Sequence, residues 1–285
     1  MNTGPSGYVL TLTCGDRIGI VACISGMLAT NRLNIVTSHQ FSEPDSNRFF
    51  MRIAFIGEAD DVAKFSVEAH EAAAGAGLAL ELWNERHRPR ILLMVSNFGH
   101  CLNDLLYRHR IGALQVEIPA VVSNHETFRG LCEAHGIPFI HLPIDVRTKA
   151  DREEELVGII EDNDIELVVL ARYMQILSPD LCARLSGRAI NIHHSFLPSF
   201  KGAMPYRQAY ERGVKLIGAT AHYVTSDLDE GPIIEQEVLR VDHSKTPADL
   251  TAAGRDIESL VLARAVQAHV EHRVFPNGRK TVVLR

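Results

Sequence analysis

The sequence predicts an α/β protein in two parts: a small N-terminal βαββαβ domain, and then a larger domain built on a doubly wound, mostly parallel sheet. Three observations carry this prediction. Within residues 1–85, apolar patterning runs strand, helix, strand, strand, helix, strand. Residues 86–90 are short, charged and broken by Pro89, as expected of a linker. In residues 91–285, strands alternate with helices, which favours a parallel sheet.

Composition narrows the classes of function. The 285 residues suit two domains, and 46% hydrophobic with 22% charged residues is ordinary for a globular protein with a full core. The net charge of −6 shows no basic excess, so we expect neither nucleic acid nor a membrane as a main partner. No stretch approaches the roughly 20 apolar residues of a membrane span.

The cysteines and the N-terminus predict a cytoplasmic location. Five scattered cysteines form no C-x-x-C pair, a pattern typical of reduced thiols. The first ten residues, MNTGPSGYVL, lack a positively charged start followed by an apolar signal core.

In the first domain, strands are expected over residues 8–13, 33–41, 49–56 and 78–83, and helices over 18–31 and 60–74. The turn-rich stretch 42–47 predicts a hairpin between the second and third strands. Gly75 and Gly77 end the second helix.

In the second domain, the expected strands are 91–95, 116–122, 138–141, 165–171, 189–192, 216–224 and 233–241, with a short one over 281–284. The expected helices are 101–109, 125–135, 151–161, 178–185, 203–213 and 246–272. Ser178 and Thr246, each followed by proline, are candidate helix caps. No G-x-G-x-x-G follows any strand, so we expect no nicotinamide or flavin cofactor.

Polar residues end the buried strand 189–192. Asn191 and His193 lie where ligands bind in open α/β sheets, and His222 and Asp229 lie in and after the strand 216–224. An amide donor beside an imidazole suits chemistry at a carbonyl group. The alternative is a polar strand end that satisfies loose backbone groups. Ser195 is not expected to be a nucleophile, because G-x-S-x-G is absent.

The motifs NIHHSFLPSFKG and LDEGPII resemble those of the folate-dependent formyltransferase fold, over roughly residues 90–270. Relatives in that fold include glycinamide ribonucleotide transformylase and methionyl-tRNA formyltransferase. The resemblance implies a catalytic trio of Asn191, His193 and Asp229, with His222 supporting it. It also implies a folate pocket walled by Met174, Gln175, Ile176, Leu177, Val224 and Thr225.

The N-terminal βαββαβ order, with GDRIGIVACISGMLATNRLNI across its first turn, resembles the ACT domain. ACT domains commonly bind small amino acids and pair their sheets between subunits, which implies a homo-oligomer. The resemblance places the amino-acid ligand at Asp16, Gly19, Ile20, Asn34 and Ile35. A purely architectural role in oligomerisation is the alternative.

With both domains fused, the whole chain resembles the 10-formyltetrahydrofolate deformylases. The resemblance implies hydrolysis to tetrahydrofolate and formate, with folate as a substrate, water as co-substrate, and no cofactor or metal. Asn191 and His193 would stabilise the oxyanion, and Asp229 would activate water. Glycine or methionine is the expected effector.

Three alternatives remain open. The chain could transfer the formyl group to an unidentified amine, although Ser96–His100, with a bulky Phe98, makes a poor phosphate cradle. It could be an amino-acid sensor with an inactive catalytic domain. It could also be a metal hydrolase, with zinc-type ligands from His193, His194, His222 and Asp229, although we expect the adjacent His193 and His194 to point to opposite faces of a strand.

Overall fold

The computed structural model describes residues 6–144, 146, 148–197 and 205–285. The chain folds into two compact units. The first contains residues up to Arg88 together with 271–275 and 282–285, and the second contains 89–270 and 276–281. The chain therefore crosses between units within the expected linker and again near its C-terminus.

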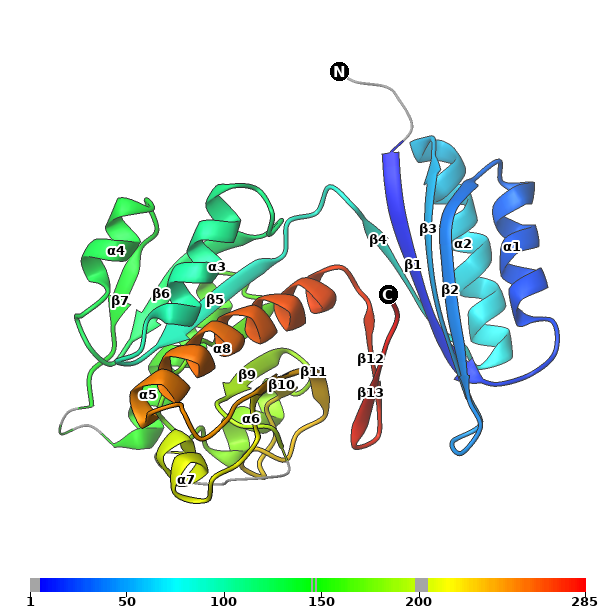
Figure 1. Cartoon of the computed structure of the whole chain (residues 1–285). Helices are drawn as coiled ribbons and strands as arrows, with labels where there is room; N and C mark the ends of the chain where they lie inside the picture. The colour runs from blue at the N-terminus through cyan, green and yellow to red at the C-terminus, as the bar shows by residue number, and fades with distance from the viewer. Residues whose placement is uncertain (1–5, 145, 147, 198–204) are drawn as a thin grey trace. The chain divides into compact units, whose positions relative to one another are not determined.

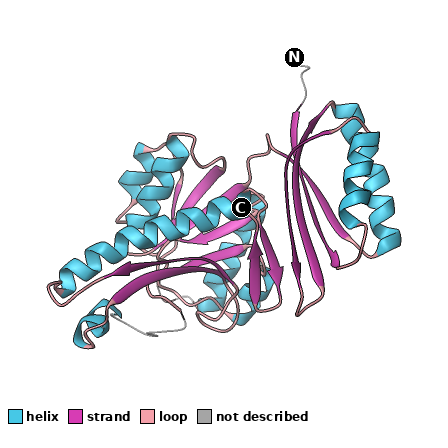
Figure 2. Ribbon diagram, turned by 45° about the vertical axis from the view of Figure 1, so that its right-hand side comes forward, coloured by secondary structure: helices cyan, strands magenta, loops and turns pink. Residues whose placement is uncertain are grey.

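The first unit is built on an antiparallel sheet of four strands in the order β2-β3-β1-β4. Figures 1 and 2 show both helices on the same face of this sheet. The elements are β1 (Ser6–Gly15), α1 (Ile20–Thr30), β2 (Asn34–Glu43), β3 (Arg48–Gly57), α2 (Ala59–Ala76) and β4 (Ala79–Asn84). This is the expected βαββαβ order, and β2 and β3 form the expected antiparallel pair.

Alternate residues of the strands form the core beneath the two helices. Leu12 of β1 and Ile53 of β3 are fully buried there, against Leu28 of α1 and Phe65 of α2. Burial alternates along the strands and follows the helical repeat along the helices, because each element buries one of its faces in this core.

The other face of this sheet is covered by the chain's C-terminal end. Phe50 points away from the helices and packs against Phe275 and Leu284, and Trp83 stacks on His272 with ring centroids 4.0 Å apart. His272, Phe275 and Leu284 lie in or beside a hairpin of β12 (Val274–Asn277) and β13 (Lys280–Val283). The sequence analysis missed β12 and placed the whole C-terminus with the second domain. Phe50 gives β3 an apolar side chain on this second face, and residues distant in sequence bury it.

The second unit has a seven-stranded sheet in the order β11-β10-β9-β8-β5-β6-β7. Strands β9 through β7 run parallel, and β10 and β11 are antiparallel additions. The strands are β5 (Arg90–Val95), β6 (Glu117–Ser123), β7 (Phe139–His141), β8 (Leu167–Leu170), β9 (Ala189–His193), β10 (Leu216–Tyr223) and β11 (Ile233–Arg240). The predicted mostly parallel sheet is confirmed.

Six helices accompany this sheet among the described residues: α3 (His100–Arg110), α4 (Arg129–Ala134), α5 (Lys149–Asp162), α6 (Pro179–Arg184), α7 (Pro205–Glu211) and α8 (Pro247–Val270). Both predicted caps form, because Ser178 Oγ accepts from Leu181 N and Thr246 Oγ1 accepts from Asp249 N, each at 3.2 Å. The helix α4 is shorter than expected. The PSFKG part of the sequence motif, and the start expected for the next helix at Ala203, lie outside the described residues.

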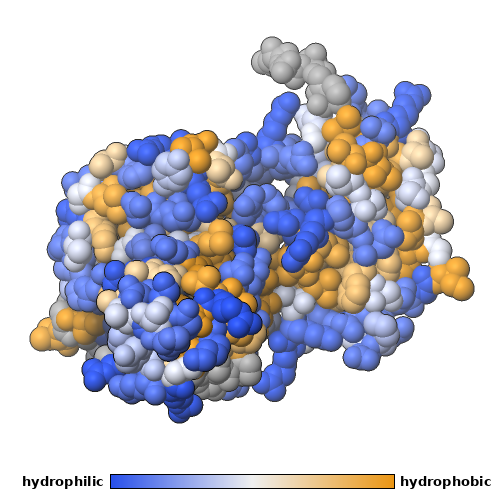
Figure 3. Space-filling view, in the orientation of Figure 1, coloured by the Kyte–Doolittle hydropathy of each residue, from blue (hydrophilic) through white to orange (hydrophobic). Residues whose placement is uncertain are grey.

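The surface mixes hydrophilic and hydrophobic side chains (Figure 3). On the first unit, the edge strand β2 exposes Val36 by 59% and Phe41 by 42%. All five cysteines are free thiols. In the part of the chain that the structure describes, no helix is both long and apolar enough to cross a membrane.

Candidate active site

A cavity of about 630 Å³ opens in the second unit at the carboxyl ends of β8 and β9. Parallel strands bind ligands at this end because the connecting loops spread apart there. Asn191, His193, His222 and Asp229 all line this cavity. The structure thus brings together the residues that the sequence proposed as catalytic and supporting.

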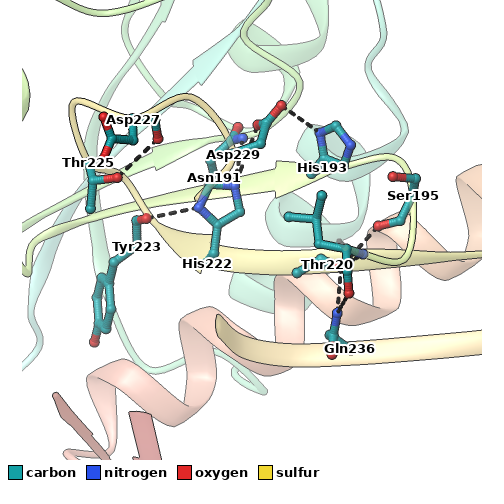
Figure 4. Close-up of polar contacts among 11 residues, drawn as sticks. Asn191, His193, Ser195, Thr220, His222, Tyr223, Thr225, Asp227, Asp229 and Gln236 are labelled. Atoms are coloured by element: carbon teal, nitrogen blue, oxygen red, sulfur yellow. Dashed lines mark hydrogen bonds and ion pairs between the residues drawn. The ribbon is translucent and has the colours of Figure 1, made fainter. Parts of the chain in front are cut away.

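Strand geometry explains why these side chains meet. Asn191 and His193 are two apart on β9, so they share a face. His222 of β10 lies directly opposite Asn191 in the antiparallel register, and the loop after β10 returns Asp229 over them (Figure 4).

Hydrogen bonds define the state of His222. Its Nδ1 lies 2.8 Å from the carbonyl oxygen of Tyr223, so Nδ1 carries a proton and donates it. Its Nε2 lies 3.3 Å from Asn191 Nδ2 but 3.7 Å from Asp229 Oδ1. His222 Nε2 is therefore close enough to accept one hydrogen of the Asn191 amide. The second amide hydrogen is left for a ligand.

His193 and Asp229 lie side by side in the site. Nδ1 of His193 lies 3.2 Å from Asp229 Oδ2. Burial alone would raise the pKa of Asp229, but its interactions with His193 and His222 outweigh burial and hold that pKa well below the usual range. His193 is 4% exposed, and its Nε2 has no hydrogen-bond partner among the described residues. Nε2 is therefore the ring atom available to a substrate.

A buried hydroxyl fixes the chain that follows these residues. Thr220 Oγ1 donates to the carbonyl of Ser195 at 2.9 Å and accepts from the backbone N–H of Leu197 at 3.1 Å. Gln236 Nε2 supports Thr220 Oγ1 at 2.9 Å (Figure 4). These bonds hold the end of β9 in place, so the His193 ring keeps its orientation.

The loop that carries Asp229 is tightly constrained. Asp229 itself has φ of 58°, the left-handed region that non-glycine residues adopt at some cost. Gly231 leaves no room for a side chain, since a Cβ there would lie 1.7 Å from the carbonyl oxygen of Tyr223. That same carbonyl binds His222 Nδ1. The loop and the His222 tautomer are thus coupled.

Replacing Gly231 with alanine is expected to lower both stability and activity. The added methyl must push away the Tyr223 carbonyl, which would displace His222 and the Asp229 loop together. Overpacking of this kind costs about 1–3 kcal/mol. Urea unfolding and steady-state kinetics measure the two effects.

Gly158→Ala is the matched control, because a Cβ at Gly158 in α5 meets nothing within 4 Å. Alanine in a helix interior is expected to stabilise by about 0.5–1 kcal/mol. Wild-type kinetics from Gly231→Ala would contradict the coupling.

The six residues expected to bind folate all line the cavity: Met174, Gln175, Ile176, Leu177, Val224 and Thr225. Ser96 fixes the first part of this wall, because its N–H donates to Arg172 O at 3.1 Å and its Oγ accepts from Met174 N at 3.0 Å. The exposed Met174 and Ile176 add apolar surface to the wall, which suits a flat heterocyclic ligand.

The sequence analysis missed a second polar group in the cavity, made of His100, Arg172, His194, Tyr206 and Glu258. The expectation that His193 and His194 point to opposite faces is wrong. β9 ends at His193, so the alternation stops there, and the two rings lie 4.9 Å apart. Glu258 carried a detectable signal, since it is an acidic residue beside Ile257 and Val261 in the buried stripe of α8.

One group of side chains outside the proposed catalytic residues has the spacing of metal ligands. Among the described residues, the group with suitable spacing is His100, Cys101 and Glu258, whose ligand atoms lie within 4.8 Å of one another. Arg172 already pairs with the Glu258 carboxylate, and burial raises the pKa of the Cys101 thiol, which opposes the thiolate form that binds metals. These residues fit a metal ion poorly.

The residues expected to bind an amino acid lie in the first unit, apart from this cavity. Gly19 precedes α1 with φ of 95°, and Asp16 accepts a hydrogen bond from Ser42 Oγ. Asn34 is exposed, whereas Ile35 packs against the core and Ile20 is buried in it. The binding role of these residues stays a prediction.

Comparisons with known proteins place the chain in a family. The formyl transferase family matches residues 89–266, which includes every residue named in the cavity. A formyltetrahydrofolate deformylase from Corynebacterium sp. (strain P-1) is 50% identical over 280 residues, covering 98% of this chain and 98% of the relative.

Solved structures show the same architecture. The formyltetrahydrofolate deformylase from Burkholderia mallei superposes with a TM-score of 0.93 at 50% identity, covering 98% of this chain and all of that one. Glycinamide ribonucleotide transformylase 1 from Symbiobacterium toebii has a TM-score of 0.67 at 30% identity, covering 72% of this chain and 98% of that one. The likeness to the transformylase thus leaves more than a quarter of this chain unmatched.

Proposed function

The chain belongs to the formyltetrahydrofolate deformylase family, and from this premise we propose that it hydrolyses 10-formyltetrahydrofolate to tetrahydrofolate and formate. The main supporting observation is that Asn191, His193 and Asp229 lie together at the cavity. A hydrogen of the Asn191 amide and the Nε2 nitrogen of His193 are left for the substrate. It is a hydrolase that acts on a linear amide bond.

We assign the attack on the formyl carbon to a water held by Asp229. The carboxylate is ionised, and its Oδ1 lies 3.7 Å from His222 Nε2. Oδ1 can therefore accept a proton from water as the oxygen attacks. The resulting tetrahedral carbon carries an oxyanion, which the Asn191 amide and a protonated His193 stabilise.

The leaving group then needs a proton at N10. His193 Nε2 is the donor that we propose, because it is buried, faces the cavity and has no partner among the described residues. Asp229 at Nδ1 stabilises the charged ring until the proton leaves. Water balances the reaction: its oxygen ends in formate, one of its protons replaces the proton that His193 gives to N10, and the other is released to solvent.

The direct test is release of formate from 10-formyltetrahydrofolate by the purified chain without any added acceptor. Stoichiometric formate and tetrahydrofolate are expected. A folded protein that releases no formate, but produces a formylated amine when amines are supplied, would move the assignment to a transferase.

We further propose that the reaction needs no cofactor or metal. Both nitrogens of His222 are engaged, and His193 already pairs with Asp229. Activity that survives dialysis against a chelator supports this proposal. Activity lost on chelation and restored by zinc would overturn it.

We propose that the first unit is an ACT-like regulatory domain that binds glycine or methionine. Supporting observations are its βαββαβ topology and the left-handed Gly19 directly before α1, where backbone N–H groups can approach a carboxylate. The proposed ligand residues are Asp16, Gly19, Ile20, Asn34 and Ile35.

Millimolar glycine or methionine is therefore expected to change the rate of formate release. Asn34→Ala should abolish the response, and its exposed position makes misfolding a poor explanation. Thr30→Ala, an exposed change at the far end of α1, is the control that keeps the response. Rates independent of both amino acids would count against the proposal.

We also propose a cytoplasmic homo-oligomer. The free thiols suit a reducing compartment. The strand β2 is an edge strand with exposed Val36 and Phe41, which can pair with another copy. Sedimentation equilibrium tests the assembly, and a monomer at micromolar concentration would refute it.

A further inference from the structure

A closed ionic cluster lies in the cavity beside the proposed catalytic residues. We call His100, Arg172, Tyr206 and Glu258 the Glu258 cluster. Glu258 is 1% exposed. Its Oε1 accepts from Tyr206 Oη at 2.6 Å, and its Oε2 from His100 Nε2 at 2.8 Å. Arg172 Nε lies 3.3 Å from the same Oε2. Both carboxylate oxygens are thus engaged within the protein.

The local backbone is shaped to place this cluster. Arg172 has φ of 66°, a conformation in which a non-glycine residue is disfavoured by roughly 1–2 kcal/mol. At Gly254, one turn before Glu258, a Cβ would lie 2.2 Å from Tyr206 Oη. Glycine there lets the tyrosine reach the carboxylate. The strained backbone of Arg172 and the missing side chain at Gly254 both allow contacts with the Glu258 carboxylate.

One side chain, His194, lies between the Glu258 cluster and His193. The Tyr206 ring lies 6.4 Å from that of His194, which lies 4.9 Å from the ring of His193. Burial and the charge of Arg172 lower the pKa of His194 to about 4, so this ring is neutral. The region beside His193 is therefore occupied by the neutral His194 ring and, beyond it, by Tyr206, which donates a hydrogen bond to Glu258.

Both oxygens of the Glu258 carboxylate already accept hydrogen bonds, so this carboxylate offers little to an incoming amine. To seat such a molecule, the protein would have to break contacts to a buried carboxylate, which is strongly unfavourable. Water is small enough to need no such change. Arg172 and Phe98 narrow the same side of the cavity, with the guanidinium 5.5 Å from the ring centroid.

We propose that the Glu258 cluster occupies the place from which an organic amine would approach the formyl carbon, and so restricts the acceptor to water. The inference rests on the proposed hydrolysis. In both reactions the bond from the formyl carbon to N10 breaks and N10 gains a proton. Water leaves its oxygen in formate and gives up both protons, one of them in exchange for the proton on N10, whereas an amine would form a new carbon–nitrogen bond and give up one proton.

Arg172→Gly tests the proposal with little risk to folding, because glycine adopts the left-handed backbone without strain. His100 and Tyr206 still satisfy Glu258 in this variant. With glycinamide as the probe amine, we expect the ratio of N-formylglycinamide to formate to rise at least about tenfold over wild type. Because the readout is a ratio of products, a general loss of rate does not alter it.

Three further variants make the result specific. Tyr206→Ala opens the opposite side of Glu258 and should also raise the ratio. Arg172→Lys keeps a cation and part of the volume but loses the planar guanidinium beside Phe98, so it should raise the ratio less than Arg172→Gly. Arg255→Ala is the matched control, since this guanidinium lies 5.8 Å from the same Phe98 ring, whereas the cation paired with Glu258 is Arg172.

Formate as the only product of both Arg172→Gly and Tyr206→Ala, at saturating glycinamide and with hydrolysis still measurable, would overturn the proposal. An equal rise in Arg255→Ala would also overturn it, because a looser cavity mouth would then suffice. A wild-type protein that releases no formate would instead refute the proposed function, so the two failures are distinguishable.

Discussion

Replacing Asp229 with asparagine is expected to reduce kcat for hydrolysis by about 10²–10⁴-fold, the usual contribution of a general base. The side chain keeps its size but loses the charge that polarises water and stabilises the protonated His193. Because the pKa of Asp229 lies well below its usual range, the wild-type charge is present throughout the neutral region. Single-turnover formate release measures the loss.

Glu230→Gln is the control for Asp229. It removes a neighbouring carboxylate that pairs with Arg279 at 3.7 Å and does not line the cavity. Near-wild-type activity is expected. An Asp229→Asn enzyme with wild-type kcat would show that water is activated elsewhere.

The lowered pKa of Asp229 also predicts how the free energy of unfolding depends on pH. A pKa lowered by folding contributes stability above the unfolded value, about 3.9. That contribution is lost as the pH falls further towards the folded pKa. The difference in unfolding free energy between wild type and Asp229→Asn should therefore change below about pH 4 and stay constant above about pH 5. Urea titrations at fixed pH values test it.

The second large effect is expected for His193. Changing it to glutamine removes both a cationic donor to the oxyanion, worth about 10²–10³-fold, and the proton for N10. His194→Gln should lose much less, because that ring is neutral and lacks a carboxylate partner equivalent to Asp229. Equal losses in the two variants would place the proton donor elsewhere. Burst kinetics with rapid acid quench separates bond cleavage from product release.

The double variant Asp229→Asn with His193→Gln adds a further check. The two side chains share a hydrogen bond at 3.2 Å and act on one proton path. We therefore expect the double loss to be far smaller than the product of the single losses. A fully multiplicative loss would mean that the two residues act independently.

Much of the fold could be predicted from the sequence, because local signals agree with the final structure. Alternating burial marked the strands of the first unit, and the Ser178 and Thr246 caps marked helix starts. The two motifs placed Asn191, His193, His222 and Asp229 at strand ends and in the loop after a strand. Parallel strands bring their carboxyl ends together, so the sequence already implied that these side chains meet.

Other features depended on the tertiary structure, because they arise between residues distant in the chain. Phe50 is covered by Phe275 and Leu284, more than 200 positions away, so no local pattern assigned the C-terminus to the first unit. Because β9 ends at His193, the alternation of side chains along a strand does not extend to His194, and this residue lines the cavity as well. The Glu258 cluster draws one side chain from each of four separate elements or loops, and its residues look ordinary in isolation. The sequence alone identified the residues that we propose as catalytic, whereas long-range packing decided what surrounds them.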